Sequence, residues 1–182
     1  MNLKSAELVI KKALEIANET LGIEFVEYVI LDENKFQNEN TKAFFERYYY
    51  LIKYNKNWII KATEEEILIE TYKQTRHAYQ QVQIEFRDKL LELKVYVEDL
   101  DTIKCWEEEL SYYSEDDDVD NEDFVQQNTE IDSFAFAKIL CDIVNAIEII
   151  VPNIIEEKVN ERVKEILGNG LWNRIVLDYG NV

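Results

Sequence analysis

The sequence predicts an α+β fold, with several amphipathic helices packed on a small antiparallel sheet. Apolar residues recur at helical spacing over most of the chain, and two short segments are rich in β-branched and aromatic residues. Only four Gly and one Pro occur among 182 residues, which favours long regular elements with few tight turns. Hydrophobic residues make up 47% of the chain, so we expect one domain with a substantial core over residues 1–182.

The first part of the chain is expected to supply the sheet. Leu3–Leu21 has apolar residues at i, i+3 and i+4 spacing and is followed by a glycine, as expected of an amphipathic helix. Ile23–Leu31 is predicted to be a strand and Asp32–Asn40 a polar loop. Tyr48–Tyr54 and Trp58–Lys61 are predicted to form a β-hairpin. The seven aromatic residues between positions 44 and 58 are expected to be buried on one face of this hairpin. Stacking of nucleotide bases on them is the alternative.

Helices are expected to dominate the rest of the chain. Thr63 and Glu66 form a capping-box pattern, and apolar residues then follow at helical spacing as far as Leu90. A shorter helix over Asp99–Tyr113 is predicted to lead into an acidic loop, Ser114–Asn128.

Two more helices are predicted after this loop. One begins at Thr129 and continues until Pro152 breaks it. The other covers Asn153–Leu167 and is followed by two glycines and an apolar tail. This last helix and the tail could join two copies of the chain as a homodimer.

The charge of the chain is concentrated in its second half. The net charge is −18, but residues 1–90 carry 15 acids against 13 bases, while residues 91–182 carry 23 acids against 7 bases. Between residues 92 and 132, 16 acids meet only two lysines. We therefore divide the domain into a near-neutral α/β half over 1–91, an acidic insertion over 92–132 and C-terminal helices over 133–182. Such a surface suits a basic protein partner and repels the phosphates of nucleic acid, so direct nucleic-acid binding is not expected.

Aromatic side chains are interleaved with the acids of this insertion, as in interfaces that set aromatic anchors among charge pairs. The predicted partner-binding residues are Trp106, Tyr112, Tyr113, Glu115, Asp116, Asp117, Asp118, Asp120, Glu122 and Asp123. A solvated loop without a partner is the alternative. The run also resembles the start of a calcium loop, but Asn121 and Gln127 stand where that motif has Gly and Glu, which excludes a standard calcium site.

Several classes of protein are disfavoured by the sequence. No segment resembles a signal peptide, and no apolar run is long enough to span a bilayer, so no membrane association is expected. Cys105 and Cys141 have no metal-binding or redox spacing, which is typical of reduced thiols in a cytoplasmic protein. A glycine-rich phosphate loop is absent, and no cofactor is expected.

One string within the long helix resembles a catalytic motif. Residues 76–80 read Arg-His-Ala-Tyr-Gln. This string resembles the second half of the zincin-type metallopeptidase helix, in which His-Glu-x-x-His places two zinc-binding imidazoles one turn apart and the Glu is the general base. Residues 130–137, Glu-Ile-Asp-Ser-Phe-Ala-Phe-Ala, resemble the acidic ligand helix of small proteins of this group from bacteria and mobile elements. The resemblance covers residues 45–140 and implies a zincin-like core.

The chain departs from this motif at the residues that perform the chemistry. Lys73 stands at the first ligand position and Gln74 at the general-base position. A lysine ammonium opposes a dication, and an amide does not accept a proton from water. His77 is the only histidine, so the remaining, weak metal ligands are His77, Glu130 and Asp132. Ordinary helix residues, a zincin-like scaffold without metal, and a working site are the three interpretations that stay open.

The combination of a degenerate motif and an anionic surface suggests a non-catalytic inhibitor carried by a mobile element. Such an inhibitor would occupy the basic groove of a nucleic-acid-binding defence enzyme, as anti-CRISPR and anti-restriction proteins do, and its partner would be a CRISPR effector nuclease or a restriction enzyme. The alternative is a divergent hydrolase, either a metallopeptidase or a nuclease, using Lys73, Arg76, His77 and Glu130. A third possibility is an assembly or regulatory protein whose acidity keeps it soluble.

Overall fold

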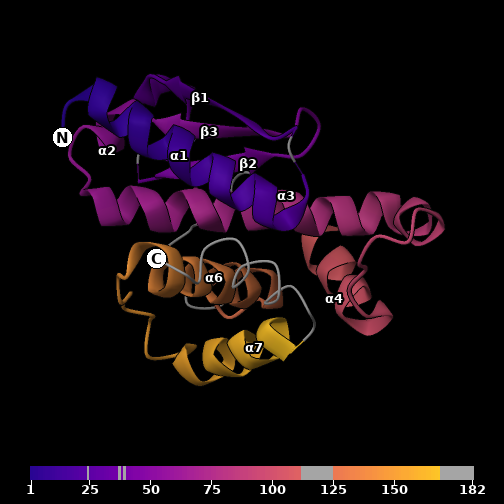
Figure 1. Cartoon of the computed structure of the whole chain (residues 1–182). Coiled ribbons are helices and arrows are strands. Elements are labelled where there is room, and N and C mark those ends of the chain that lie inside the picture. The colour runs from indigo at the N-terminus through magenta and orange to yellow at the C-terminus, as the bar shows by residue number, and fades with distance from the viewer. Residues whose placement is uncertain (24, 37, 39, 112–124, 169–182) are drawn as a thin grey trace.

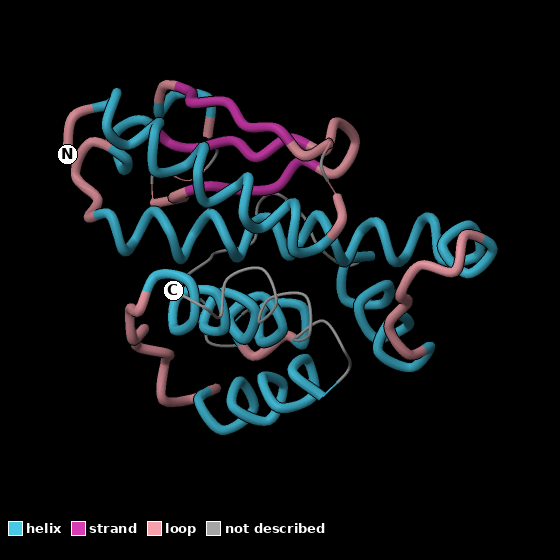
Figure 2. Tube along the Cα trace, viewed as in Figure 1, coloured by secondary structure: helices cyan, strands magenta, loops and turns pink. Residues whose placement is uncertain are grey.

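The computed structural model describes every residue except 24, 37, 39, 112–124 and 169–182, and it has the predicted α+β class. Figure 1 shows three strands on one side of the long helix α3 (Glu64–Glu92), with α1 (Leu3–Leu21) lying across them. The helices α6 (Asn128–Leu140) and α7 (Glu156–Gly168) lie on the opposite side of α3. The long helix is therefore the element that joins the sheet layer to the C-terminal helices, as the tube view in Figure 2 also shows.

The first helix forms as predicted. Its buried face consists of small and branched residues that include Ala6, Ile10 and Ala13, all fully buried. Gly22 ends the helix with a φ of 70°, a left-handed conformation that glycine adopts at little cost. Amphipathic spacing and a terminal glycine were sufficient to locate both ends of α1.

The sheet was predicted to be antiparallel, but it is mixed. Its order is β1–β3–β2, with β1 (Glu27–Leu31) parallel to β3 (Leu51–Asn55) and β2 (Ala43–Glu46) antiparallel to β3. The strand β3 carries the fully buried side chains of Ile52 and Tyr54, so burial favours the central position for it. Because β3 inserts between two strands that run in opposite directions, one of its two neighbours must be parallel.

The predicted hairpin has shifted along the chain. The antiparallel pair is β2 with β3, and the turn lies at residues 47–50, where Tyr50 has a φ of 49°. Residues 58–61, predicted as a strand, instead belong to the short helix α2 (Lys56–Ile59) and the turn after it. The side chain of Asn55 caps this helix by accepting a hydrogen bond of 2.9 Å from Asn57 N. This local cap diverts the chain before a second strand can form.

The capping box of α3 is confirmed. Thr63 N donates to Glu66 Oε2 at 2.8 Å, and Glu66 N donates to Thr63 Oγ1 at 3.2 Å. The buried side of the helix runs from Ile67 to Gln83 and includes many polar residues. Figure 1 shows that its C-terminal turns extend beyond the sheet and lead into α4 (Leu100–Ser111), close to the predicted second helix.

The C-terminal helices differ in length from the prediction. α6 ends at Leu140, and a π-helical turn (η2, Cys141–Asn145) follows, so the helix does not continue to Pro152. Ala146 then adopts a left-handed conformation (φ 53°), and the N–H of the next residue, Ile147, donates to Cys141 O at 2.9 Å, which closes the turn. The last helix begins at Glu156 and reaches Gly168, three residues later at its start than predicted.

Two predictions concern the membrane and the redox state of the cysteines. None of the described helices combines the length and apolarity that a membrane crossing requires. Cys105 and Cys141 are both free thiols, the first partly buried and the second fully buried. The acidic loop is predicted at Ser114–Asn128, and most of it, with the apolar tail, lies outside the described residues.

Candidate functional site

Three side chains of the predicted site meet between α3 and α6. Lys73 and His77 lie one turn apart on α3, and Glu130 faces them from the first turn of α6. Lys73 Nζ is 3.1 Å from Glu130 Oε2, and His77 Nε2 is 3.0 Å from Glu130 Oε1. The ammonium also lies 4.0 Å from the ring centroid of Phe134. One carboxylate thus bridges two basic side chains in what we name the Lys73–Glu130–His77 cluster.

The hydrogen bonds around His77 determine its protonation. Gln80 Nε2 donates to Thr129 O at 3.0 Å and to Asp132 Oδ2 at 2.8 Å, which fixes the orientation of this amide. Gln80 Oε1 therefore faces His77 Nδ1, at 2.9 Å. An amide oxygen only accepts, so Nδ1 must donate, and Nε2 donates to the Glu130 carboxylate. With both ring nitrogens donating, His77 is an imidazolium.

The electrostatics of the cluster agree with this assignment. Burial opposes the charged form of each group, but the opposite charges outweigh it. The pKa of Glu130 falls to about 2 because the charges of Lys73 and His77 exceed the effect of desolvation. The pKa of Lys73 is raised, since Glu130 and Glu70 more than offset its burial. The pKa of His77 is raised against burial by the Glu130 carboxylate and by its hydrogen bonds.

These residues do not fit a zinc ion. Both oxygens of Glu130 face cations, and His77 has no lone pair available in the imidazolium form. Gln74 Nε2 donates to Glu70 Oε1 at 2.8 Å, so the residue at the general-base position is engaged along its own helix. Within the described part of the chain, no group of three or more His, Cys, Asp or Glu side chains could hold a metal.

The other two predicted site residues form a separate buried cluster. Arg76, fully buried, binds Asp132 through two hydrogen bonds, from Nε at 2.7 Å and from Nη2 at 3.0 Å. Its Nη2 also donates to Glu98 Oε1 at 3.0 Å. Arg162 of α7 contacts the same carboxylates, with Nε 2.8 Å from Asp132 and Nη2 3.2 Å from Glu98. Two guanidinium groups and two carboxylates thus form a neutral structural cluster, in which Asp132 has a pKa lowered to about 2 because the two arginines outweigh its burial.

The structure therefore corrects the predicted site. Arg76 does not join Lys73 and His77, and Asp132 does not join Glu130 as a metal ligand, because each is committed to the arginine–carboxylate cluster. Sequence reasoning missed Glu98 and Arg162. For Arg162 a signal exists, since Val159, Arg162 and Ile166 follow the i, i+3, i+7 spacing of an inward-facing stripe. Glu98 lies among other acidic residues in the sequence, and no local pattern distinguished it as a buried partner of arginine.

Trp106 was predicted to be an aromatic anchor for a partner, but the structure buries it among basic side chains. Its side chain is 1% exposed. The indole lies 5.8 Å from the Arg76 guanidinium and 5.7 Å from that of Arg162, measured to the ring centroid. Cation–π attraction and burial together account for its place inside the molecule. The other predicted partner-binding residues, from Tyr112 to Asp123, lie outside the described residues.

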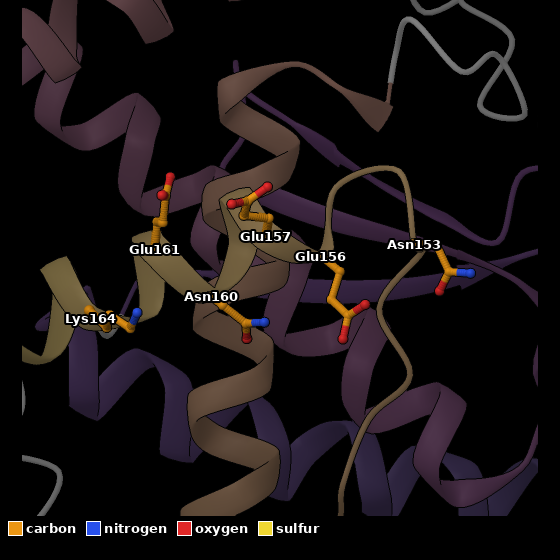
Figure 3. Close-up of a pocket in the computed structure, with 6 residues that line it drawn as sticks. All are labelled: Asn153, Glu156, Glu157, Asn160, Glu161 and Lys164. Carbon is orange, nitrogen blue, oxygen red and sulfur yellow. The ribbon is translucent and has the colours of Figure 1, made fainter.

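Acidic side chains do line two hollows on the described surface. A groove of ≈ 390 Å³ lies between α4, the start of α6 and α7. It is lined by Asp99, Asp101, Thr102, Cys105, Trp106, Asn128, Ile131, Lys158, Glu161, Arg162 and Glu165. A shallower hollow along α7 is lined by Asn153, Glu156, Glu157, Asn160, Glu161 and Lys164 (Figure 3). Glu161 borders both hollows, so acidic side chains of α7 line a continuous stretch of surface that includes both.

Comparison with known protein families, with curated proteins and with solved structures finds no match to this chain.

Proposed function

We propose that this chain is a non-catalytic binding protein on a zincin-like scaffold, and that it inhibits a basic, nucleic-acid-binding host enzyme. A CRISPR effector nuclease or a restriction enzyme is the class of partner that fits this chemistry. The observation that carries the proposal is the Lys73–Glu130–His77 cluster, in which an ammonium and an imidazolium satisfy the carboxylate that a metal would need. A site closed by internal cations supports binding, rather than hydrolysis, as the function.

The order of elements supports the zincin-like part of the proposal. A helix, three strands and a long helix come first, and α6 then presents Glu130 to His77 from across the gap between the helices. This is the relation expected between a motif helix and an acidic ligand helix. Lys73 supplies from within the chain the positive charge that a metal ion would supply, which keeps Glu130 ionised without a bound ligand.

Charge supports the binding part of the proposal. The helix α4 has four acids and one lysine, and its Asp101 borders the groove between α4, α6 and α7. Arg162, one of the two basic groups in that groove, is already paired with Glu98, Asp132 and Glu165. The groove therefore presents a surplus of negative charge to its surroundings. A basic surface that normally holds nucleic acid is the complementary partner, and the inhibitor would act by occupying it.

The geometry of the cluster supports the hydrolase alternative less well than it supports the binding function. A nuclease or peptidase needs a group that accepts a proton from water or a metal that activates it. Gln74 is an amide, His77 already carries two protons, and Lys73 is protonated beside Glu130. Glu130 is paired with both of these cations, and Arg76 is bound to Asp132 and Glu98, so the four residues named for such an enzyme lack a free base.

The test is inhibition of DNA cleavage by purified CRISPR effector nucleases and restriction enzymes of the host. We expect the wild-type chain to block at least one of them at low salt and to lose potency as salt rises. The variant Asp101→Lys/Glu161→Lys should lose about tenfold in potency, since it reverses charges that border the groove. Glu7→Lys/Glu15→Lys is the matched control, because it changes the net charge by the same amount on exposed positions of α1.

Two results would contradict the proposal. One is equal potency of the groove variant and wild type against every enzyme that the chain inhibits. The other is stoichiometric zinc in the purified protein that is lost, together with a hydrolytic activity, on His77→Ala.

A further inference from the structure

The groove between α4, α6 and α7 contains three carboxylates that have no ion pair. Asp99 and Asp101 lie at the start of α4, and Glu161 lies on α7. Within the described part of the chain, none of the three forms a salt bridge. Hydrogen bonds from Thr102 hold the pKa of Asp99 below its ordinary value of 3.8, so this carboxylate remains ionised at neutral pH.

The two basic side chains of the groove do not neutralise these carboxylates. Arg162 already contacts Glu165 and the two carboxylates of the arginine–carboxylate cluster. Lys158 forms no ion pair with any described residue. Three unpaired anions therefore share the groove with one unpaired cation, and the groove attracts positive charge.

A second polar group reaches the groove from inside the molecule. Trp106 lines the groove although it is only 1% exposed. Its indole N–H donates no hydrogen bond to any described residue, and it is not among the enclosed polar atoms that lack a partner there. The N–H is therefore the accessible edge of the indole, and it presents one unused donor to the groove.

The unused donor and the unpaired carboxylates together indicate a peptide ligand. The N–H needs an acceptor oxygen, and the carboxylates need a cation. A metal ion or a polyamine has no acceptor to offer, and the phosphates of nucleic acid are repelled by the carboxylates. A peptide segment that contains arginine or lysine supplies both, because each backbone carbonyl accepts a hydrogen bond and a guanidinium pairs with carboxylates.

The surface beyond the groove extends this match. Glu161 also borders the hollow along α7, and Glu157, one turn earlier, points to the same side of the helix (Figure 3). This hollow is lined by three acidic side chains and one basic side chain, Lys164. An extended segment with two basic residues can therefore place one cation in the groove and the next beside Glu157.

We propose that the groove binds an extended segment of a partner protein that contains arginine or lysine. A backbone carbonyl of the segment accepts from the Trp106 N–H, and a cationic side chain lies beside Asp101 and Glu161. This inference rests on the proposed binding function and narrows it, since the partner contributes a linear basic segment. Trp106 acts here as a buried hydrogen-bond donor rather than as an aromatic anchor.

Calorimetric titration of the full chain with a capped peptide of alternating arginine and glycine tests this proposal. We expect one peptide to bind per chain at low salt, with an affinity that falls as salt rises. Asp101→Asn/Glu161→Gln should bind the peptide about tenfold more weakly. Glu7→Gln/Glu15→Gln is the matched control, because it removes the same charge from exposed positions of α1, and it should bind as wild type does. A peptide of alternating glutamate and glycine should not bind.

Two spectroscopic and chemical measurements test the place of binding and the hydrogen bond. Cys105 lines the groove, whereas Cys141 is fully buried, so maleimide labelling of Cys105 reports on occupation of the groove. The arginine peptide should slow this labelling. It should also move the indole N–H resonance of Trp106 downfield in NMR spectra. Spermidine, a cation without an acceptor, should leave that resonance in place.

Three results would overturn the proposal: no binding of the arginine peptide, equal binding by wild type and Asp101→Asn/Glu161→Gln, or equal shifts of the Trp106 resonance with spermidine and peptide. A chain that inhibits an enzyme but does not bind the peptide refutes this inference alone. A chain that binds the peptide in the groove but inhibits no enzyme supports this inference and contradicts the proposed inhibition. The two proposals can therefore fail separately.

Discussion

Lys73 Nζ lies 3.1 Å from Glu130 Oε2, and the two side chains, 12% and 5% exposed, join α3 to α6 almost out of reach of water. The residues are far apart in the sequence, so this ion pair forms only when the two helices dock. The cation that neutralises the Glu130 carboxylate here is a side chain of the same protein. Each buried charge of this pair is compensated by the other, so removing either side chain would leave an uncompensated charge between the two helices.

Replacing Lys73 by methionine should destabilise the fold. The substitution keeps most of the side-chain volume but leaves the buried Glu130 carboxylate with His77 as its one remaining cation. We expect a loss of about 3 kcal/mol in the free energy of unfolding, measured by urea denaturation. Lys56→Met, which removes an exposed ion pair with Asp32, is the control and should cost less than about 1 kcal/mol. Equal small losses for both variants would show that the buried pair has no special role.

Replacing Lys73 by histidine should create metal affinity. The substitution removes the internal ammonium and supplies a second imidazole one turn from His77, with Glu130 opposite as the third ligand. We expect zinc binding by isothermal titration calorimetry for Lys73→His and none for wild type or Lys73→Met. The binding should release protons, since His77 must lose one to coordinate. Zinc binding by wild type with equal affinity would exclude the idea that Lys73 takes the place of a metal.

The protonation of His77 should make the free energy of unfolding depend on pH above 6.5. Its folded pKa is raised above the ordinary value of 6.5, so protonation stabilises the fold. This contribution is fully present below pH 6.5 and is lost as the pH rises through the folded pKa. The difference in unfolding free energy between wild type and His77→Gln should therefore shrink as the pH rises. NMR titration of the single imidazole checks the direction directly, and a folded pKa below 6.5 would contradict it.

Asp132 should control how the free energy of unfolding depends on pH under acidic conditions. Its pKa is lowered from 3.8 to about 2 because Arg76 and Arg162 outweigh the effect of its burial. The stability it provides is present above the unfolded value of 3.8 and is lost as the pH falls toward 2. Asp132→Asn should cost about 3 kcal/mol at neutral pH, by urea denaturation, because it leaves two guanidinium groups with one carboxylate between them. Asp142→Asn, in a surface pair with Lys138, is the control, and an equal effect of the two variants would refute the structural role of Asp132.

Local patterns predicted local structure well. The amphipathic stripe and glycine of α1 and the capping box of Thr63 depend on residues within one or two turns of each other. The hairpin was misplaced because strand pairing depends on which apolar residues reach the core, and Asn55 acts as a helix cap where a turn was expected. The π-helical turn after Leu140 has no comparable local signal in the sequence.

The candidate site was predicted in part. The spacing of Lys73 and His77 on one helix predicted that they share a face, and the likeness of residues 130–137 to a ligand helix placed Glu130 opposite them. Nothing local separated Glu130 from Asp132 in role, although they are two residues apart and lie in different clusters. Trp106 was misjudged because its indole packs beside the Arg76 and Arg162 guanidinium groups, which are distant from it in the sequence.

By itself the sequence determined the α+β class, the helices with clear caps, the uneven charge, and the presence of Lys73 and Gln74 where the motif that it resembles has a metal ligand and a general base. Only the tertiary structure decided which charges neutralise one another. Lys73 and His77 share Glu130, while Arg76 and Arg162 share Asp132 and Glu98. The physical reason is that burying a charge is unfavourable unless an opposite charge lies within hydrogen-bond distance, and that distance is set by how helices dock rather than by separation along the chain.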